Sequence, residues 1–225
     1  MNIQIKQIII LGDSSVYGWG DPVEGGWCER VRKSFMNVPS APIIYPLGIR
    51  GDGLERVSKR WRQEWSTRGE LRRKSPEAIL ISVGLNDTAH IGRRDGRPQL
   101  SSDAYQFGLK QLLKEIKSYT KVFVLGLTPV EESAMPFAEC LWYLNHDISI
   151  YESKIEETCL ELNVPFLPIH KCMISEPYWR NWLEPDGIHL NSEGHYWLYQ
   201  KIMQWKSFLE FVEIEPINTV TYTNY

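Results

Sequence analysis

The sequence predicts a three-layer α/β sandwich built around a central sheet of five parallel strands. Five short runs rich in Ile, Val and Leu are too short to form helices. None of these runs alternates cleanly between apolar and polar residues, as expected for strands whose sheet is covered on both faces. Longer amphipathic stretches separate the runs, and this repeated alternation of strand and helix is typical of a layered α/β fold.

The expected elements follow directly from these patterns. The strands are expected at residues 5–11, 42–47, 78–83, 121–127 and 164–169. The helices are expected at 27–37, 54–65, 101–119 and 145–163, with a last one from near Asn191 to beyond Trp205. Three inserts, at 67–74, 88–100 and 129–144, are longer than ordinary connections. The polar, Thr-rich residues 213–225 form either a frayed end or a strand-like arm.

Composition and charge limit the class of protein. Of the 225 residues, 43% are hydrophobic and 24% are charged, which argues against a mainly disordered chain. No linker rich in Pro, Gly or Ser divides residues 1–225, so we expect a single domain. The net charge of −3 and the pI of about 6.0 give no general attraction to nucleic acid or to an anionic membrane.

The cysteines and the first residues point to an ordinary intracellular protein. The four cysteines contain no C-x-x-C pair, so we expect reduced thiols and neither a disulfide framework nor a metal site. The apolar run from Ile8 to Leu11 is far shorter than a signal-peptide core or a membrane span. We therefore expect a cytoplasmic location and no integral membrane segment.

Polar residues beside glycine occur where a ligand site of such a sheet is expected. Ligands bind outside the carboxyl ends of the strands in open parallel sheets. Residues 12–15, 48–52 and 84–87 follow the first three expected strands, and residues 186–189 precede the last helix. All four segments combine glycine with polar side chains, and this coincidence indicates one shared site.

The residue types in these segments suit nucleophilic catalysis. A serine hydroxyl such as that of Ser14 attacks efficiently only when a base accepts its proton. His189 is a suitable base near neutral pH, and Asp186, three residues earlier, is placed to orient it. The backbone of Gly51 and the side chain of Asn86 supply donors suited to the oxyanion that forms during attack on an acyl group.

The four segments together resemble the SGNH or GDSL family of serine esterases and lipases. The matching blocks are Gly12-Asp13-Ser14, then Gly51, then G-x-N-D at 84–87 and D-x-x-H at 186–189. In this order and spacing they span about residues 6–205. The resemblance implies a flavodoxin-like sheet, no cofactor, and hydrolysis of the ester or thioester bonds of a small molecule.

The resemblance also implies roles for individual residues. Ser14 is the implied nucleophile, His189 the base and Asp186 its partner, while the Ser14 and Gly51 N–H groups and the Asn86 side chain form the oxyanion hole. The residues expected to support this site are Gly12, Asp13, Gly84 and Asp87.

Two departures from the family pattern bear on the site. Ser15 stands where leucine usually follows the nucleophile, but the position within the block favours Ser14 as the attacking residue. The Asn that often opens the second block is replaced around Pro46. His195 is a rival base, but no Asp lies at short range in the sequence, so His189 is preferred.

Nine tryptophans require a separate explanation. Those on expected helices are interpreted as core residues: Trp61, Trp65, Trp197 and Trp205. Those in loops near the expected site are interpreted as substrate contacts in an aromatic cleft: Trp19, Trp142, Trp179 and Trp182. Trp27 is left open between the two groups.

Four alternatives remain open at this point. The same residues also suit acyl transfer to an alcohol or sugar, and the Ser-rich loop at 12–15 suits a non-hydrolytic, flavodoxin-like binding module. The basic stretch 56–74 is interpreted as a solvated helix and loop, with a phosphate or nucleic-acid patch as the alternative. Arg93, Arg94 and Arg97 are candidates for attracting an anionic end of a substrate, although a solvated loop is favoured.

Overall fold

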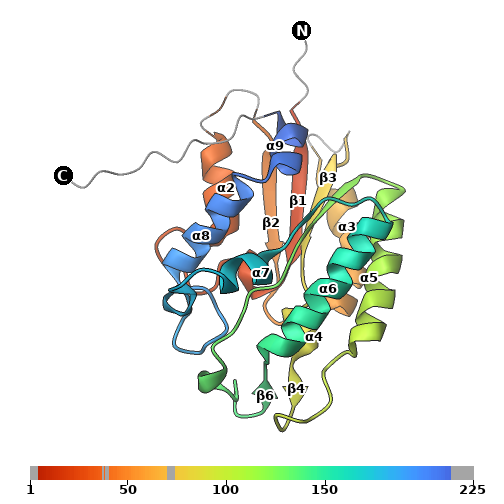
Figure 1. Cartoon of the computed structure of the whole chain (residues 1–225). Helices are drawn as coiled ribbons and strands as arrows, with labels where there is room; N and C mark the ends of the chain where they lie inside the picture. Colours follow the sequence, from red (N-terminus) through yellow and green to blue (C-terminus); the bar gives the residue numbers. More distant parts are fainter. Residues whose placement is uncertain (1–4, 37, 39–40, 70–73, 214–225) are drawn as a thin grey trace, which may run out of the picture.

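Five parallel strands form the central sheet in the order β2-β1-β3-β5-β7, as shown in the computed structural model (Figure 1). The structure describes residues 5–36, 38, 41–69 and 74–213. The strands are β1 (Gln7–Gly12), β2 (Ile43–Gly48), β3 (Ala78–Ser82), β5 (Lys121–Leu125) and β7 (Phe166–Leu167). The number, order along the chain and parallel direction of the strands confirm the predicted fold class. The expected arm or frayed end lies outside the described residues from 214 onward, as does part of the 67–74 insert.

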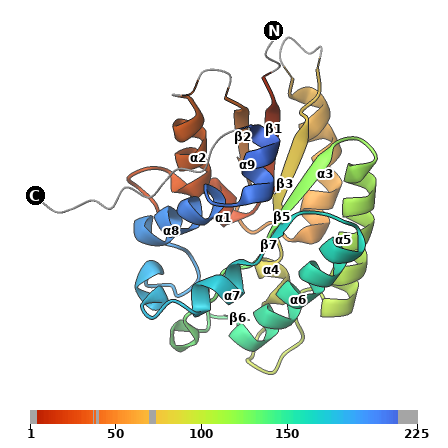
Figure 2. The ribbon, with the colours of Figure 1, turned by 45° about the horizontal axis from the view of Figure 1, so that its top comes forward.

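Helices cover both faces of the sheet and make the three layers visible in Figure 2. One face carries α2 (Gly26–Met36), α7 (Ile169–Ile174), α8 (Ser192–Ile202) and α9 (Lys206–Val212). The other carries α3 (Leu54–Thr67), α5 (Ser102–Lys117) and α6 (Asn145–Glu161).

The central strand β1 shows why these strands are apolar throughout. Successive side chains point to opposite faces of a strand. Ile9 and Leu11 therefore pack in the core beneath α3, α5 and α6, whereas Ile8 and Ile10 pack beneath α2, α8 and α9. All four side chains have 0% exposure. A polar side chain at any of these positions would lose its hydrogen bonds to water, which would destabilise the fold.

Two predicted elements differ in extent from the structure. The predicted strand at 164–169 shrinks to β7, because Pro165 and Pro168 have no N–H to donate to a neighbouring strand. The predicted last helix is two helices, α8 and α9. The chain turns between them at Trp205, whose ring packs against Phe123 and Phe208.

Several short elements were not predicted, because they are too short to show a periodic pattern. Two single-turn helices, α1 (Ser14–Tyr17) and α4 (Leu85–Thr88), follow β1 and β3. Two 3-10 turns, η2 (Glu132–Ala134) and η3 (Trp179–Trp182), lie in longer connections. The inserts at 88–100 and 129–144 are also joined, because β4 (His90–Ile91) pairs antiparallel with β6 (Leu141–Trp142). Figure 1 shows β4 and β6 side by side at the end of the molecule opposite the N-terminus.

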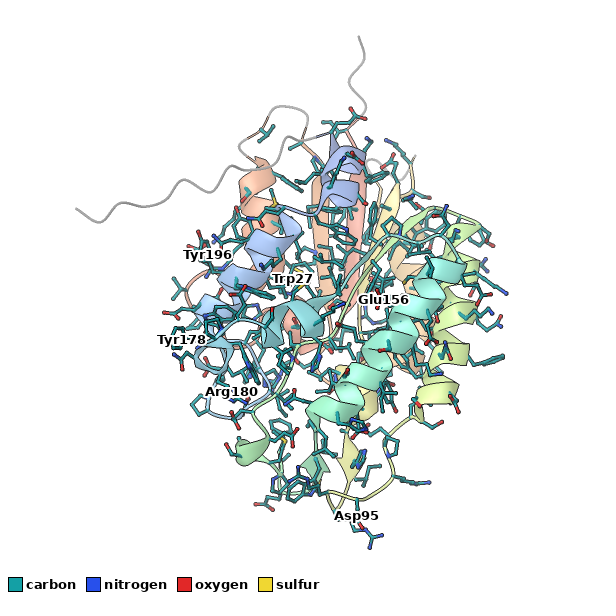
Figure 3. The ribbon with its side chains drawn as sticks, in the orientation of Figure 1. Trp27, Asp95, Glu156, Tyr178, Arg180 and Tyr196 are labelled. Carbon is teal, nitrogen blue, oxygen red and sulfur yellow. The ribbon has the colours of Figure 1, made fainter. Side chains whose placement is uncertain are left out.

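The tryptophans expected in the core are confirmed there. Trp61, Trp197 and Trp205 are buried, and Trp65 packs partly buried against the same core as Trp61. Trp27 joins this group, because its side chain is fully buried between α2 and the sheet (Figure 3). The four cysteines are free thiols, as predicted. Within the described ranges, no helix combines the length and apolarity that crossing a bilayer requires.

Gly12, the last residue of β1, offers a test of the packing beneath the site. A Cβ there would lie 2.2 Å from the Ser82 carbonyl oxygen and 2.4 Å from Val16 Cγ2. We expect Gly12→Ala to lower the free energy of unfolding by about 1–3 kcal/mol, because overpacking displaces backbone. Urea denaturation checks this change.

Gly108→Ala is the matched control. It lies within α5, and its added Cβ would meet only the flexible end of Leu54, at 3.1 Å. Because alanine favours a helix over glycine by about 1 kcal/mol, we expect this variant to be neutral or more stable. Equal urea midpoints for the two variants would contradict the close-approach argument.

Candidate active site

The carboxyl ends of the strands bring the four polar segments around one cavity of about 270 Å³. Ser14 on α1 contributes from the end of β1, and Gly51 from the turn after β2. Asn86 contributes from α4, after β3, while His189 comes from the turn before α8. Residues that are 175 positions apart in the chain are thereby placed within hydrogen-bond distance.

Ser14, His189 and Asp186 form a continuous chain of hydrogen bonds. The Ser14 Oγ and His189 Nε2 atoms are 3.0 Å apart, and His189 Nδ1 and Asp186 Oδ2 are 2.6 Å apart. A neutral histidine has one donor and one acceptor nitrogen. Since the carboxylate accepts from Nδ1–H, Nε2 is left to accept the Ser14 hydroxyl proton.

A tight turn fixes the Asp186 carboxylate. Asp186 Oδ1 accepts hydrogen bonds from the N–H groups of Ile188 (2.9 Å) and His189 (3.0 Å). Burial raises the pKa of Asp186, but the hydrogen bonds from the His189 side chain and from these two N–H groups lower it more, so the pKa lies below its usual value. The carboxylate is therefore charged at neutral pH and suited to stabilise a protonated His189.

Gly187 makes this turn possible. Its φ of +73° lies in the left-handed region, and an added Cβ would come within 2.8 Å of the Glu131 carbonyl oxygen. The Glu131 N–H donates to the Gly187 carbonyl (2.8 Å), so the 129–144 insert supports the turn that carries Asp186 and His189.

The two neighbouring serines have different surroundings. The Ser14 hydroxyl meets His189, whereas the Ser15 hydroxyl accepts a hydrogen bond from Trp27 Nε1 at 3.1 Å. The side chain of Asp13 caps α1 by accepting from the Ser15 N–H at 2.9 Å. Only Ser14 is therefore placed to pass its proton to the histidine.

The rival base His195 is fully buried and already has two partners. Its Nδ1 accepts from the Trp27 N–H (3.2 Å), so its Nε2 is the donor to the Trp19 carbonyl oxygen (3.0 Å). Burial lowers the pKa of His195, which keeps the ring neutral at neutral pH. His195 joins the segment after α1 to the start of α2 and does not line the cavity.

Gly51 and Ser14 both line the cavity. The Asp52 N–H donates to the Ile49 carbonyl (3.1 Å), and Gly51 has a φ of +77°, as expected for glycine at the third position of a type II turn. Within the described part of the chain, no acceptor lies within hydrogen-bond reach of the Ser14 or Gly51 N–H.

Asn86 lies against the same region of the cavity. Its Nδ2 group donates to Asp13 Oδ2 (3.3 Å) and to the Asp52 carbonyl (3.1 Å). Its Oδ1 accepts from the Tyr143 hydroxyl at 3.4 Å. These contacts from both ends of the amide define which way the Asn86 side chain faces.

The acidic residues expected to support the site are buried beneath it. Burial raises the pKa of Asp13 to about 6, against the lowering effect of its hydrogen bond from Ser15. Burial likewise raises the pKa of Asp87 to about 7. Both oxygens of Asp87 accept from the Leu54 N–H, at 3.2 and 3.0 Å, so Asp87 caps α3 from a neighbouring element. Gly84 is the N-cap residue of α4.

Trp19 alone of the four tryptophans expected in the cleft lines the cavity. Trp179 is buried in the core because η3 packs against α8, and Trp182 stacks on Trp197. Trp142 lies in β6 and packs on the periphery of the opposite core. The prediction of a four-tryptophan cleft is therefore wrong for Trp142, Trp179 and Trp182.

Other lining residues were not singled out from the sequence. Phe137 and Tyr143 come from the 129–144 insert, and the Phe137 ring lies edge-on to His189 with centroids 6.0 Å apart. Arg50 also lines the cavity, whereas Arg93, Arg94 and Arg97 do not. Arg93 and Arg94 instead form ion pairs with Asp95 and Glu132 on the surface. A single cation or aromatic residue in a turn has no periodic pattern that would identify it.

A family comparison identifies the class of protein. The model of the GDSL-like lipase/acylhydrolase family matches residues 10–197, most of the chain. The chain belongs to this family. It is a GDSL-type esterase or lipase. A search of curated proteins found no match.

Solved structures share the fold of this GDSL-type hydrolase. A lipase/acylhydrolase from Enterococcus faecalis has a TM-score of 0.72 at 20% identity, covering 95% of this chain and 99% of the other. A catalytic mutant of an acetylxylan esterase from Geobacillus stearothermophilus has a TM-score of 0.68 at 16% identity, covering 95% and 97%. A psychrotrophic esterase from Pseudoalteromonas sp. also has a TM-score of 0.68 at 16% identity, covering 91% and 99%.

The raised pKa of Asp87 predicts a pH-dependent contribution to stability. The folded protein holds this proton more tightly than the unfolded chain, whose ordinary value is 3.8. The stabilisation is complete below about pH 4 and is lost as pH rises toward 7. We expect the free energy of unfolding of wild type, relative to Asp87→Asn, to fall by up to about 1.4 kcal/mol per pH unit across this interval.

Urea denaturation of both proteins between pH 4 and 8 measures this slope. Asp95→Asn is the matched control, because it removes an exposed carboxylate at the tip of a loop (Figure 3). A relative stability of Asp87→Asn that is constant with pH, or that changes in the opposite direction, would contradict the assigned burial effect.

Proposed function

We propose that the protein hydrolyses carboxylic esters through an acyl-enzyme formed on Ser14. The observation that carries this proposal is the hydrogen-bonded chain from Ser14 through His189 to Asp186 beside the cavity. The N–H groups of Ser14 and Gly51, which also line this cavity, have no hydrogen-bond partner among the residues that the structure describes. A nucleophile, a base and a residue that orients the base are the three parts that serine-dependent acyl transfer requires.

In the first step, Ser14 Oγ bonds to the ester carbonyl carbon while its proton passes to His189 Nε2. The electron pair of the C=O bond moves to the carbonyl oxygen, which becomes an oxyanion. Asp186 stabilises the positive charge on the imidazolium. The tetrahedral intermediate then collapses: the bond to the alkoxy oxygen breaks, and His189 returns its proton to the departing alcohol.

The oxyanion is stabilised by donors already fixed by the fold. The N–H groups of Ser14 and Gly51 are proposed as two of them, because both line the cavity and are held by α1 and by the turn after β2. Asn86 is proposed as the third. Because its amide also donates to Asp13 and Asp52, it must exchange or share one of these bonds, and the longer bond to Asp13 is the weaker of the two.

The second step regenerates the enzyme. His189 accepts a proton from water as the water oxygen attacks the acyl carbon. The bond between that carbon and Ser14 Oγ then breaks, and His189 returns the proton to Ser14. A carboxylic acid is released, and Ser14, His189 and Asp186 return to their starting protonation states.

The cavity dimensions favour a small substrate. Its volume of about 270 Å³ lies just below the range of roughly 300–1,000 Å³ that is usual for small-molecule sites. Apolar side chains from the strand ends, including Val83, Leu125 and Leu127, line it. We therefore propose that short acyl groups are accommodated better than long ones.

Ser14→Ala tests the assignment of the nucleophile. We expect kcat/KM for a short 4-nitrophenyl ester to fall by about 10⁴-fold or more, because no oxygen remains to be acylated. Ser15→Ala is the matched control and should retain most of the activity, since its hydroxyl contacts Trp27 and not His189. Circular dichroism checks that both variants are folded.

Loss of activity confined to Ser15→Ala would reverse the choice of nucleophile. Full activity in both variants would refute serine catalysis by this site. A competing alcohol in the assay distinguishes hydrolysis from acyl transfer, because transfer yields a new ester in place of the free acid.

A further inference from the structure

We propose that Arg50 makes the cavity selective for esters that carry an anionic group, a carboxylate or a phosphate, close to the ester carbonyl. This inference rests on the proposed ester chemistry, but it concerns binding and is testable without turnover. It assigns to Arg50 the recognition of charge in the substrate.

Arg50 occupies a position that faces the reacting centre. It lies in the turn after β2, directly before Gly51, whose N–H is a proposed oxyanion donor. Arg50, Ser14 and His189 line the same cavity, and Arg50 is exposed to solvent. Arg50 is therefore both accessible from solvent and part of the cavity lining.

The guanidinium is held in place by an aromatic ring. Arg50 Cζ lies 3.4 Å from the centroid of the Trp19 ring, in the geometry of a cation–π contact. The Trp19 ring lies edge-on to His189 at 6.1 Å, and the Trp19 carbonyl is bound by the buried His195. Because the contact with the Trp19 ring already restricts the guanidinium, the Arg50 side chain loses less conformational freedom when it binds a ligand.

The residues that the structure describes leave the charge of Arg50 without an ionic partner. Arg30, Arg60 and Arg94 each pair with a carboxylate, namely Asp21, Asp52 and Glu132. Among the described residues, Arg50 has neither an ion pair nor a hydrogen bond to the protein. A guanidinium has five N–H donors in a planar fork that matches a carboxylate or a phosphate.

The acidic side chains of the site are already bound to other groups, so they do not take the place of an anionic ligand at Arg50. Asp186 is engaged by His189 and two N–H groups, and Asp13 by Ser15 and Asn86. The stacked guanidinium also covers one face of Trp19, which reduces the ring surface available for a sugar. The geometry therefore favours an anionic ligand over a neutral ring.

Binding to a Ser14→Ala background tests this proposal, since the intact ester then persists. Two ligand pairs, each differing only by carboxylate against carboxamide, place the charge on either side of the ester. Monoethyl succinate and ethyl succinamate place it on the acyl side. Acetoxyacetate and acetoxyacetamide place it on the alcohol side. NMR titration measures the dissociation constant of each ligand.

We expect the anionic member of at least one pair to bind about tenfold more tightly than its carboxamide, equivalent to about 1.4 kcal/mol. In the double variant Ser14→Ala/Arg50→Gln, the two members of that pair should bind about equally tightly. In Ser14→Ala alone, the preference for the anionic member should weaken with added salt. Arg97→Gln in the same background is the matched control, because it removes an exposed cation that does not line the cavity. The responding pair identifies the side of the ester that carries the charge.

Equal binding of the two members of both pairs would overturn the proposal, as would a preference that survives Arg50→Gln. Wild-type activity on the same four esters is measured in parallel. A charge preference without any hydrolysis would refute the proposed function and leave the role of Arg50 standing. Hydrolysis without a charge preference would refute the role of Arg50 and leave the proposed function standing.

Discussion

Carboxylates that accept backbone N–H groups hold the carboxyl edge of the sheet together. Asp13 binds the N–H of Ser15, Asp87 that of Leu54, and Asp186 those of Ile188 and His189. Three further loops depend on two more carboxylates. Asp21 binds the N–H groups of residues 23, 24 and 26, and Glu152 binds those of residues 127, 170 and 171. Each of these hydrogen bonds satisfies a backbone donor of a turn, and those of Asp87 and Glu152 also join segments that lie far apart in the chain.

This arrangement explains how short turns position reacting groups accurately. Each turn that contributes to the cavity is held by contacts from another part of the chain. The 129–144 insert supports Gly187 through Glu131, and the same insert supplies Tyr143, whose hydroxyl contacts Asn86. The site is therefore built before any ligand binds, which is the condition under which fixed donors stabilise a developing charge effectively.

The sheet and the gathering of the candidate site segments at its edge were predictable from the sequence because local patterns determine them. Continuous apolar strands require covering layers, and a parallel sheet gathers the strand ends and hence the segments at 12–15, 48–52 and 84–87. The rest depends on which way a side chain points. Trp19 lines the cavity and Trp179 is buried in the core, although both lie in connections between helices. The pairing of β4 with β6 and the cation–π contact of Arg50 likewise join segments far apart in the chain, which no local pattern reveals.

Labelling with a fluorophosphonate tests the central claim most directly, because the reagent reacts much faster with an activated serine hydroxyl than with an ordinary one. Mass spectrometry of the intact protein and of its peptides locates the adduct. The account predicts one phosphonate per chain, attached to Ser14, with labelling that slows strongly in His189→Ala. An adduct on Ser15, or no adduct on the folded wild-type protein, would contradict it.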